Sequence, residues 1–258
     1  MALIALLQIG MLDGETAKVR LARGLRLLSS LDRSVRMAVF PELWVTGFFE
    51  FDDYERQAEP LDGELALQFA DAARSKRIWL HAGSIVERAD HSRFNTSLLF
   101  DPEGRLTASY RKIHLFGYRS REAELLQQGV SPVVVPTELG MIGLATCYDL
   151  RFPEFFRCML ATGAEVFVVT SAWPFPRLEH WLVLARARAI ENLAYVVACN
   201  AAGSQRGQTL LGNSLVVDPW GTPVARAGDA EQILYADLDL NRVHDWRDRF
   251  PSLHDRRL

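Results

Sequence analysis

A cysteine in the middle of the chain follows an apolar run, where its thiol could act as a nucleophile. Residues 141–146 predict a buried strand, Cys147 begins a polar turn, and Pro153 opens a predicted helix from Phe155 onward. Open α/β folds place reactive groups at the carboxyl ends of strands, and backbone N–H groups there favour the thiolate. Free cysteines are also among the most buried residue types. Position alone therefore supports a nucleophile and a packed core thiol equally.

Two other predicted strands lead to ionisable side chains. The strand 36–41 is followed by Glu42, and the strand 106–112 ends on Lys112. Charged residues at strand ends are mostly just solvated. If the three strands share one α/β sheet, however, their carboxyl ends bring Glu42, Lys112 and Cys147 to a single edge.

These three groups together would suit hydrolysis of a carbon–nitrogen bond. Glu42 could accept the proton of Cys147 and later activate water, while Lys112 could lower the thiol pKa and stabilise an oxyanion. The backbone N–H of Tyr148 could be a second oxyanion donor. Such a set attacks an amide, carbamoyl or nitrile carbon and releases ammonia through a thioester. It needs no cofactor and no metal.

The elements that must position these groups are twelve strands and four helices. The predicted strands are Leu3–Ile9, Arg36–Pro41, Ile78–Val86, Asn95–Phe100, Leu106–Lys112, Val133–Val135, Ile142–Thr146, Val166–Thr170, Tyr195–Asn200, Ser214–Asp218, Val224–Ala227 and Ile233–Asp237. The predicted helices are Glu15–Leu31, Glu64–Ser75, Phe155–Ala161 and Pro176–Asn192. Two D-P-x-G turns, at 101–104 and 218–221, suggest two similar halves, each with a hairpin. This pattern predicts an α/β fold with two face-to-face sheets and helices outside, in a single domain over residues 1–258.

Composition excludes several classes of protein. The 258 residues are 49% hydrophobic and 24% charged with net charge −3, which gives no broad basic surface for nucleic acid. Three cysteines without metal-ligand spacing predict neither a disulfide framework nor a zinc site. The apolar N-terminus lacks a basic region and predicts a first strand, and no apolar run reaches the ~20 residues of a membrane helix. A cytoplasmic protein without membrane partners is expected. The charge-mixed segment 245–258 is expected to be a solvated tail or an interface arm.

Three segments, Phe40–Leu43, Tyr110–Phe116 and Thr146–Glu154, resemble the three catalytic boxes of the nitrilase superfamily of carbon–nitrogen hydrolases. The resemblance covers essentially the whole chain and implies a four-layer αββα sandwich that assembles into homodimers or higher homo-oligomers. It implies that Glu42 is the base, Lys112 the oxyanion stabiliser and Cys147 the nucleophile.

That superfamily uses a second catalytic glutamate before a glycine in the loop after the lysine. Glu122 stands seven residues before Gly129 and matches the usual spacing, and Glu124 is the alternative.

The substrate would be held by residues beside the boxes: Phe48, Tyr148, Arg151 and Trp173. Arg151 could bind a substrate carboxylate, or it could form an ion pair with Glu154 or another structural carboxylate. Trp173 and Phe48 could line a pocket or pack in the core.

Four further side chains are given structural roles. Asp149 is expected to cap the turn after the nucleophile, or to position the lysine or its loop. His114 is expected to form a supporting hydrogen bond rather than a Cys–His pair. Cys158 and Cys199 are expected to be buried, inert thiols.

Within the superfamily, the segments Cys147–Glu154, Ala172–Pro174 and Arg188–Asn192 are most similar to the omega-amidase branch. This resemblance implies a cysteine-dependent amidase that releases ammonia from a small carboxylate-bearing amide such as succinamate or 2-oxoglutaramate. The alternatives are an N-carbamoyl or aliphatic amide hydrolase, and a non-catalytic thiol-sensing or binding member of the superfamily.

Overall fold

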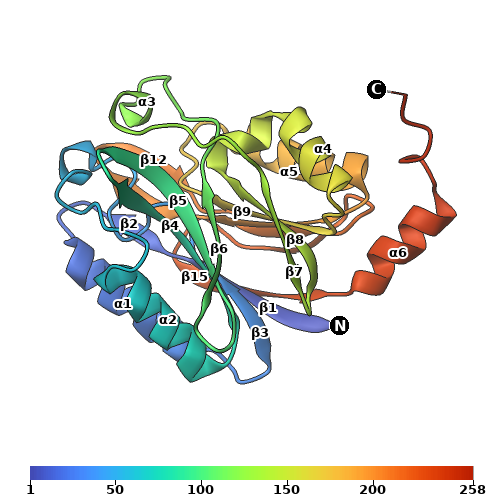
Figure 1. The fold of residues 1–258 in the computed structure, drawn as a ribbon, viewed down its shortest axis with the longest axis horizontal. Coiled ribbons are helices and arrows are strands. Elements are labelled where there is room, and N and C mark those ends of the chain that lie inside the picture. Colours follow the sequence, from blue (N-terminus) through green and yellow to red (C-terminus); the bar gives the residue numbers. More distant parts are fainter. Residues whose placement is uncertain (258) are drawn as a thin grey trace.

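The computed structural model describes residues 1–257 and shows a mixed α/β fold, which confirms the predicted class (Figure 1). The first six-stranded sheet has the strand order β15-β1-β3-β4-β5-β6. Its strands are β1 (Ala2–Gln8), β3 (Val35–Val39), β4 (Trp79–Ala89), β5 (Ser92–Phe100), β6 (Leu106–Arg111) and β15 (Gln232–Leu238). Strands β1, β3 and β4 are parallel, and β15, β5 and β6 are added in antiparallel pairs.

The second six-stranded sheet repeats this plan in the order β14-β13-β10-β9-β8-β7. Its strands are β7 (Val133–Thr137), β8 (Gly140–Thr146), β9 (Val166–Ser171), β10 (Tyr195–Asn200), β13 (Leu215–Val217) and β14 (Pro223–Arg226). Here β8, β9 and β10 are parallel, and β7, β13 and β14 are antiparallel to their neighbours. The D-P-x-G turns join β5 to β6 and β13 to β14, so the two halves share a plan as the sequence predicts.

The two sheets pack against each other through a common core. Leu6 and Val39 of the first sheet belong to the same buried cluster as Leu144 and Val168 of the second. Burial on both faces explains why β9, with sequence VFVVTS, is buried at every position.

Helices cover the other faces (Figure 1). α1 (Ala17–Ser29) and α2 (Glu64–Lys76) share a second core with the first sheet. α2 buries positions of a single helical face, namely Leu65, Ala66, Phe69, Ala70 and Ala73. α4 (Pro153–Ala161) and α5 (Leu178–Asn192) lie at the second sheet, and α4 has Pro153 in its first turn, where a missing N–H is tolerated.

Several elements depart from the sequence-based expectation. β2 (Gly10–Leu12), β11 (Ala202–Gln205) and β12 (Gln208–Leu211) form a small third sheet that is absent from the prediction. These strands have three or four residues each, too short for a periodic signal. The short helices η1 (Phe51–Asp53), η2 (Cys147–Arg151) and α3 (Glu122–Leu125) were also not predicted.

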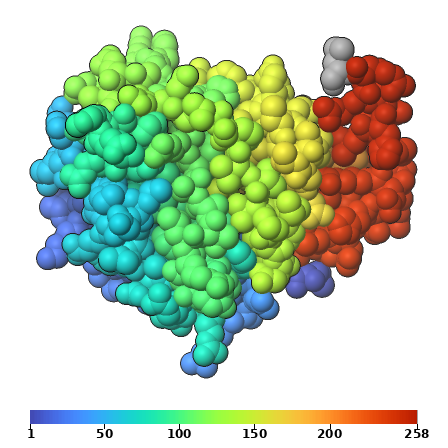
Figure 2. Space-filling model, viewed as in Figure 1, coloured from blue at the N-terminus to red at the C-terminus, as the bar shows by residue number. Residues whose placement is uncertain are grey.

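The expected tail 245–258 begins instead inside a helix. α6 (Leu240–Arg249) extends to one side of the molecule, where it forms the red edge of Figure 2. Val243 is fully buried and Trp246 stacks on Trp220, with ring centroids 3.8 Å apart. The many charged residues of this segment made its single apolar stripe too weak a signal to predict a helix. Leu258, the last residue of the predicted tail, lies outside the described residues.

Gly83 provides a test of how tightly the first sheet packs beside Glu42. Its φ is +73°, and a Cβ at this position would collide with the carbonyl oxygen of Pro41. Gly163 also has a positive φ, +94°, but nothing would lie within 4 Å of its Cβ. Gly163→Ala should therefore lower the free energy of unfolding by only the ~1–2 kcal/mol of a left-handed residue, and Gly83→Ala by clearly more. Urea unfolding of both variants measures the difference, and equal losses would contradict the predicted collision.

Candidate active site

The three predicted strand ends meet, but between two sheets rather than along one. Glu42 and Lys112 follow β3 and β6 of the first sheet, whereas Cys147 follows β8 of the second. The expectation of one shared sheet edge is wrong. Convergence arises because the two sheets share one buried core, which brings the ends of β3, β6 and β8 to the same region.

Lys112 is the centre of a fully buried cluster of charges. Its Nζ donates to Glu42 Oε1 at 2.7 Å and to both carboxylate oxygens of Glu122, at 3.0 and 2.9 Å. All three side chains have no exposed surface. Asn95 Nδ2 also donates to Glu42 Oε1 and to Glu122 Oε1, both at 2.8 Å. Removing one partner from such a buried ion pair costs about 3–5 kcal/mol, so the cluster is a strong local constraint.

The charge state of the cluster follows from burial and from these contacts. Burial opposes the charge of Lys112, but Glu122 and Glu42 together raise the pKa of its ammonium well above the ordinary value. Burial raises the pKa of Glu122 and Lys112 opposes this rise. Lys112 therefore remains a fixed positive charge at neutral pH.

Main-chain donors complete the coordination of both carboxylates. Ala172 N donates to Glu42 Oε2 at 3.0 Å, and Phe116 N donates to Glu122 Oε2 at 2.7 Å. Glu124, the alternative second glutamate, is exposed and lies 3.8 Å from Arg121. Of the two candidates, the structure brings only Glu122 to Lys112.

Cys147 lies on a strained turn directly after β8. Its φ is +46°, a left-handed conformation that is unusual for a residue other than glycine. It begins η2, and a capping box between Thr146 and Asp149 closes the turn. Tyr148 is the second residue of η2, in the first turn, where N–H groups have no intrahelical partner.

Asp149 connects this turn to the segment that carries the lysine. Its Oδ2 accepts from Tyr110 Oη and from Thr146 N, both at 2.8 Å, and its Oδ1 lies 2.7 Å from His114 Nδ1. Both roles expected for Asp149 are present: it caps the turn and it holds the lysine segment. His114 forms a supporting hydrogen bond to Asp149, as predicted.

The Cys147 thiol is in a protonated resting state. Its residue is only 7% exposed, and burial, followed by the charge of Glu42, raises the thiol pKa. Lys112 opposes this effect, so both charged groups act on the sulfur. A thiol of this kind needs a neighbouring base in order to react.

A small cavity of about 300 Å³, counting its open mouth, leads to Cys147. It contains all four predicted substrate-binding residues, and its lining is Phe48, Phe116, Cys147, Tyr148, Arg151, Ala172, Trp173, Pro174 and Arg177. Trp173 and Phe48 are almost fully buried, so each serves both the core and the cavity wall.

Arg151 makes no ion pair with Glu154. Its Nη2 lies 3.2 Å from His180 Nδ1, and its guanidinium carbon lies 4.8 Å from the Trp173 ring centroid. Burial is the main cause that lowers its pKa below the ordinary arginine value. The structural alternative for Arg151 is therefore wrong, and its guanidinium faces the cavity.

The sequence reasoning missed three residues of this region: Asn95, Phe116 and Arg177. Asn95 had a usable signal, because a fully buried amide in an apolar strand must have partners. Arg177 and Phe116 lie in loops, where no helical or strand periodicity predicts the position of a side chain. Among the other cysteines, Cys199 is buried as predicted, but Cys158 is exposed, so its expected burial in the core is wrong.

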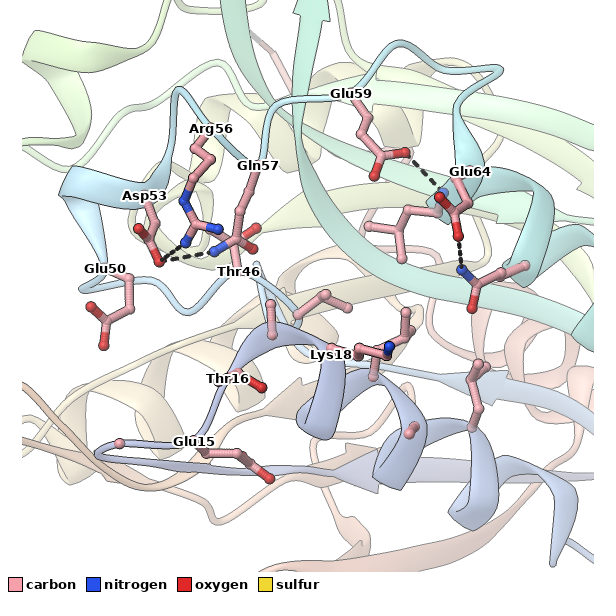
Figure 3. A pocket seen from close by; sticks show the side chains of 18 of the residues that line it. Glu15, Thr16, Lys18, Thr46, Glu50, Asp53, Arg56, Gln57, Glu59 and Glu64 are labelled. Carbon is pink, nitrogen blue, oxygen red and sulfur yellow. Dashed lines mark hydrogen bonds and ion pairs between the residues drawn. The ribbon is translucent and has the colours of Figure 1, made fainter.

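A larger groove lies elsewhere, between α1 and the segment from Val45 to Gln68 (Figure 3). Its polar groups are paired with each other: Asp53 accepts from Arg56 at 2.8 Å and from Gln57 at 3.1 Å. None of its lining residues is a cysteine, and its single lysine, Lys18, lies at the surface. The groove therefore lacks the chemistry that the smaller cavity contains.

Residues 1–257 contain neither a cluster of metal-ligating side chains nor a helix suited to crossing a membrane. No three His, Cys, Asp or Glu side chains there are grouped so that they could hold a metal ion. No helix in the same range combines the length and apolarity that crossing a membrane requires.

Comparison with known proteins gives a family match over almost the full length. The carbon-nitrogen hydrolase model matches residues 3–248. A 2-oxoglutaramate amidase of Paenarthrobacter nicotinovorans is 38% identical over 262 residues, which cover 98% of this chain and 89% of the relative.

Solved structures agree with this match. Nit3 of Saccharomyces cerevisiae, a member of branch 10 of the nitrilase superfamily, has a TM-score of 0.90 at 30% identity, covering 100% of this chain and 97% of its own. A mutant amidase of Nesterenkonia sp. AN1, solved with acrylamide added at its active-site cysteine, has a TM-score of 0.85 at 25% identity and 99% coverage of each chain.

The raised pKa of the Cys147 thiol predicts a pH dependence of stability. The folded chain keeps this proton where the unfolded chain loses it, so stability falls as pH rises above the ordinary thiol pKa of about 8.5. One such thiol contributes up to ~1.4 kcal/mol per pH unit. Cys147→Ser should make the slope of unfolding free energy against pH shallower by up to that amount between about pH 9 and 10. Urea unfolding across this range measures both slopes, and parallel slopes would show that the thiol pKa is not raised.

Proposed function

The chain belongs to the carbon–nitrogen hydrolase family, the nitrilase superfamily, and we propose that it is an amidase that releases ammonia from a small carboxylate-bearing amide. The observation that carries this proposal is the position of Cys147 beside a buried glutamate–lysine cluster, in a small cavity whose two guanidinium groups have no carboxylate partner within residues 1–257. The 2-oxoglutaramate amidase relative supports an omega-amide of a short dicarboxylic acid as the substrate class.

Four residues would each have a separate role in the first half of the reaction: Cys147, Glu42, Lys112 and Tyr148. The sulfur of Cys147 attacks the amide carbon while its proton passes to Glu42. The oxyanion forms near the fixed charge of Lys112 and the N–H of Tyr148. Glu42 then returns the proton to the leaving nitrogen, ammonia departs, and a thioester remains.

Water completes the cycle. Glu42 accepts a proton from a water molecule as it attacks the thioester carbon, and collapse of the second tetrahedral intermediate releases the acid and returns the thiol. Glu122 holds Lys112 in place throughout and compensates its charge. The chemistry uses side chains of this chain and no cofactor.

The finer architectural statements are part of the same proposal. We infer a single domain over residues 1–258 and a four-layer αββα arrangement, supported by the core that both sheets share and the helices outside them. Assembly as a homodimer or higher homo-oligomer and a cytoplasmic location remain predictions from the family resemblance.

Ammonia release from a panel of amides tests the activity. The panel contains succinamate, 2-oxoglutaramate, butyramide and an N-carbamoyl amino acid. Faster turnover of the carboxylate-bearing amides is expected. Preference for the carbamoyl compound would favour the alternative hydrolase, and no turnover of any compound would favour the thiol-sensing alternative.

Cys147→Ala should abolish ammonia release, because no other group can form the thioester. Cys158→Ala is the matched control, since that thiol is exposed and lies outside the cavity, and it should keep wild-type turnover. Steady-state ammonia release measures both. Turnover that survives in Cys147→Ala would show that the nucleophile is another group.

Glu122→Gln should reduce kcat by about 100-fold or more, the scale of a lost acid–base or charge-positioning group. It removes one of the two carboxylates that hold the ammonium of Lys112. Glu124→Gln, two residues away on the same short helix but exposed, should change kcat by less than about twofold. Equal effects of the two substitutions would mean that Glu122 has no special role.

A further inference from the structure

Two guanidinium groups line the cavity that leads to Cys147, and only one of them was expected. Arg151 belongs to η2, directly after the nucleophile, and Arg177 immediately precedes α5. Each lies over an aromatic ring of the cavity: Arg151 over Trp173 at 4.8 Å, and Arg177 over Phe116 at 5.5 Å. The rings limit the orientations that these planar groups can adopt.

Neither guanidinium has a carboxylate partner within residues 1–257. The only polar side-chain contact of Arg151 in this range is His180, and the Arg177 side chain makes no hydrogen bond in the part of the chain described. Arg23, which is also partly buried, is by contrast paired with Glu15 at 2.8 Å. Two partly buried positive charges without a counterion are unfavourable, and an anionic ligand would relieve this.

The two charges are also close enough to affect each other. The charge of Arg177 contributes to the lowered pKa of Arg151, after the larger contribution of burial, and a thiolate at Cys147 would act on Arg151 in the opposite direction. Thus the positive charges of Arg151 and Arg177 lie at the same cavity, which is also lined by Cys147. A carboxylate accepts hydrogen bonds from guanidinium groups on both of its oxygens, so it suits such a pair.

We propose that Arg177 and Arg151 together form the subsite for the distal carboxylate of the amide substrate. Arg177 is a new assignment and the inference rests on the proposed amidase function. The carboxylate binds between the two guanidinium groups while the amide carbon at the other end of the molecule reaches Cys147. Neutral amides lack this contact, and amides with an ammonium group beside the carboxylate meet repulsion from both arginines.

A pair of matched substrates tests this assignment. Succinamate and butyramide share the amide and two methylene groups, and butyramide has a methyl group in place of the carboxylate. In Arg177→Ala, kcat/KM for succinamate should fall about 10- to 100-fold, mainly through KM, as expected for loss of a charge-assisted hydrogen bond. The value for butyramide should stay within about twofold, since uniform structural damage would lower both.

Two further variants separate charge from geometry. Arg177→Lys keeps the charge but loses the planar fork, so it should restore only part of the succinamate activity. Arg186→Ala removes an exposed arginine from α5 that binds the carbonyl of Gly221 at 3.0 Å, away from the cavity. It makes the same change in net charge and should leave both substrates unaffected. Equal losses on both substrates in Arg177→Ala, or a succinamate-specific loss in Arg186→Ala, would overturn the assignment.

Binding of succinate to the wild-type protein tests the subsite without turnover. Calorimetric titration should show affinity that falls at least about 10-fold in Arg177→Ala and is unchanged in Arg186→Ala. If no amide is hydrolysed but succinate binds in this Arg177-dependent way, the amidase function fails and the subsite stands. If amides are hydrolysed but succinate binding does not depend on Arg177, the subsite fails and the function stands.

Discussion

The buried ion cluster of Lys112 with Glu42 and Glu122 is the interaction on which the rest of the site depends. Two carboxylates and an ammonium are removed from water, and their desolvation is tolerated only because each oxygen contact is satisfied by Lys112, Asn95 or a main-chain N–H. This requirement fixes the positions of the segments that contain Glu42, Lys112 and Glu122. In the proposed reaction, Glu42 therefore needs little reorganisation when it accepts the proton of Cys147.

The turn that contains Cys147 is held by a separate but adjacent network. Asp149 closes the strained turn of Cys147 and, through Tyr110 and His114, joins it to the segment that contains Lys112. Strain at φ +46° persists because the capping box and these hydrogen bonds determine the turn from several sides. Thus Cys147, after a strand of the second sheet, lies beside a charged cluster whose members Glu42 and Lys112 follow strands of the first sheet. The core between the two sheets sets the distance between the sulfur and this cluster.

Burial gives the cavity its selectivity as well as its reactivity. The thiol stays protonated at rest because it is buried beside Glu42, which protects it from unspecific reaction until a substrate is bound. Positive charge at the mouth, from Arg151 and Arg177, is balanced by no carboxylate in residues 1–257. In the proposed reaction, a protonated thiol and two guanidinium groups share one cavity, and this combination favours a small molecule with an amide at one end and an anionic group at the other.

Local sequence patterns were enough to predict the strands with a strong apolar signal, the class of the fold and the ionisable groups at three strand ends. These features are local: periodicity reports burial, and a charged residue directly after a buried strand stands out. Even the preference for Glu122 over Glu124 came from its spacing to Gly129. Short strands such as β11 and the helix α6 had signals too weak to be found.

Packing alone placed Glu42 and Lys112 after strands of one sheet and Cys147 after a strand of the other. It also brought Asn95 between the two glutamates, placed Arg177 in the lining of the cavity that contains Cys147, and left Cys158 at the surface. The physical reason is that these facts depend on the packing of sheet against sheet and loop against loop. The local sequence of a strand or loop does not identify the segment that packs against it, because that segment lies far away in the sequence.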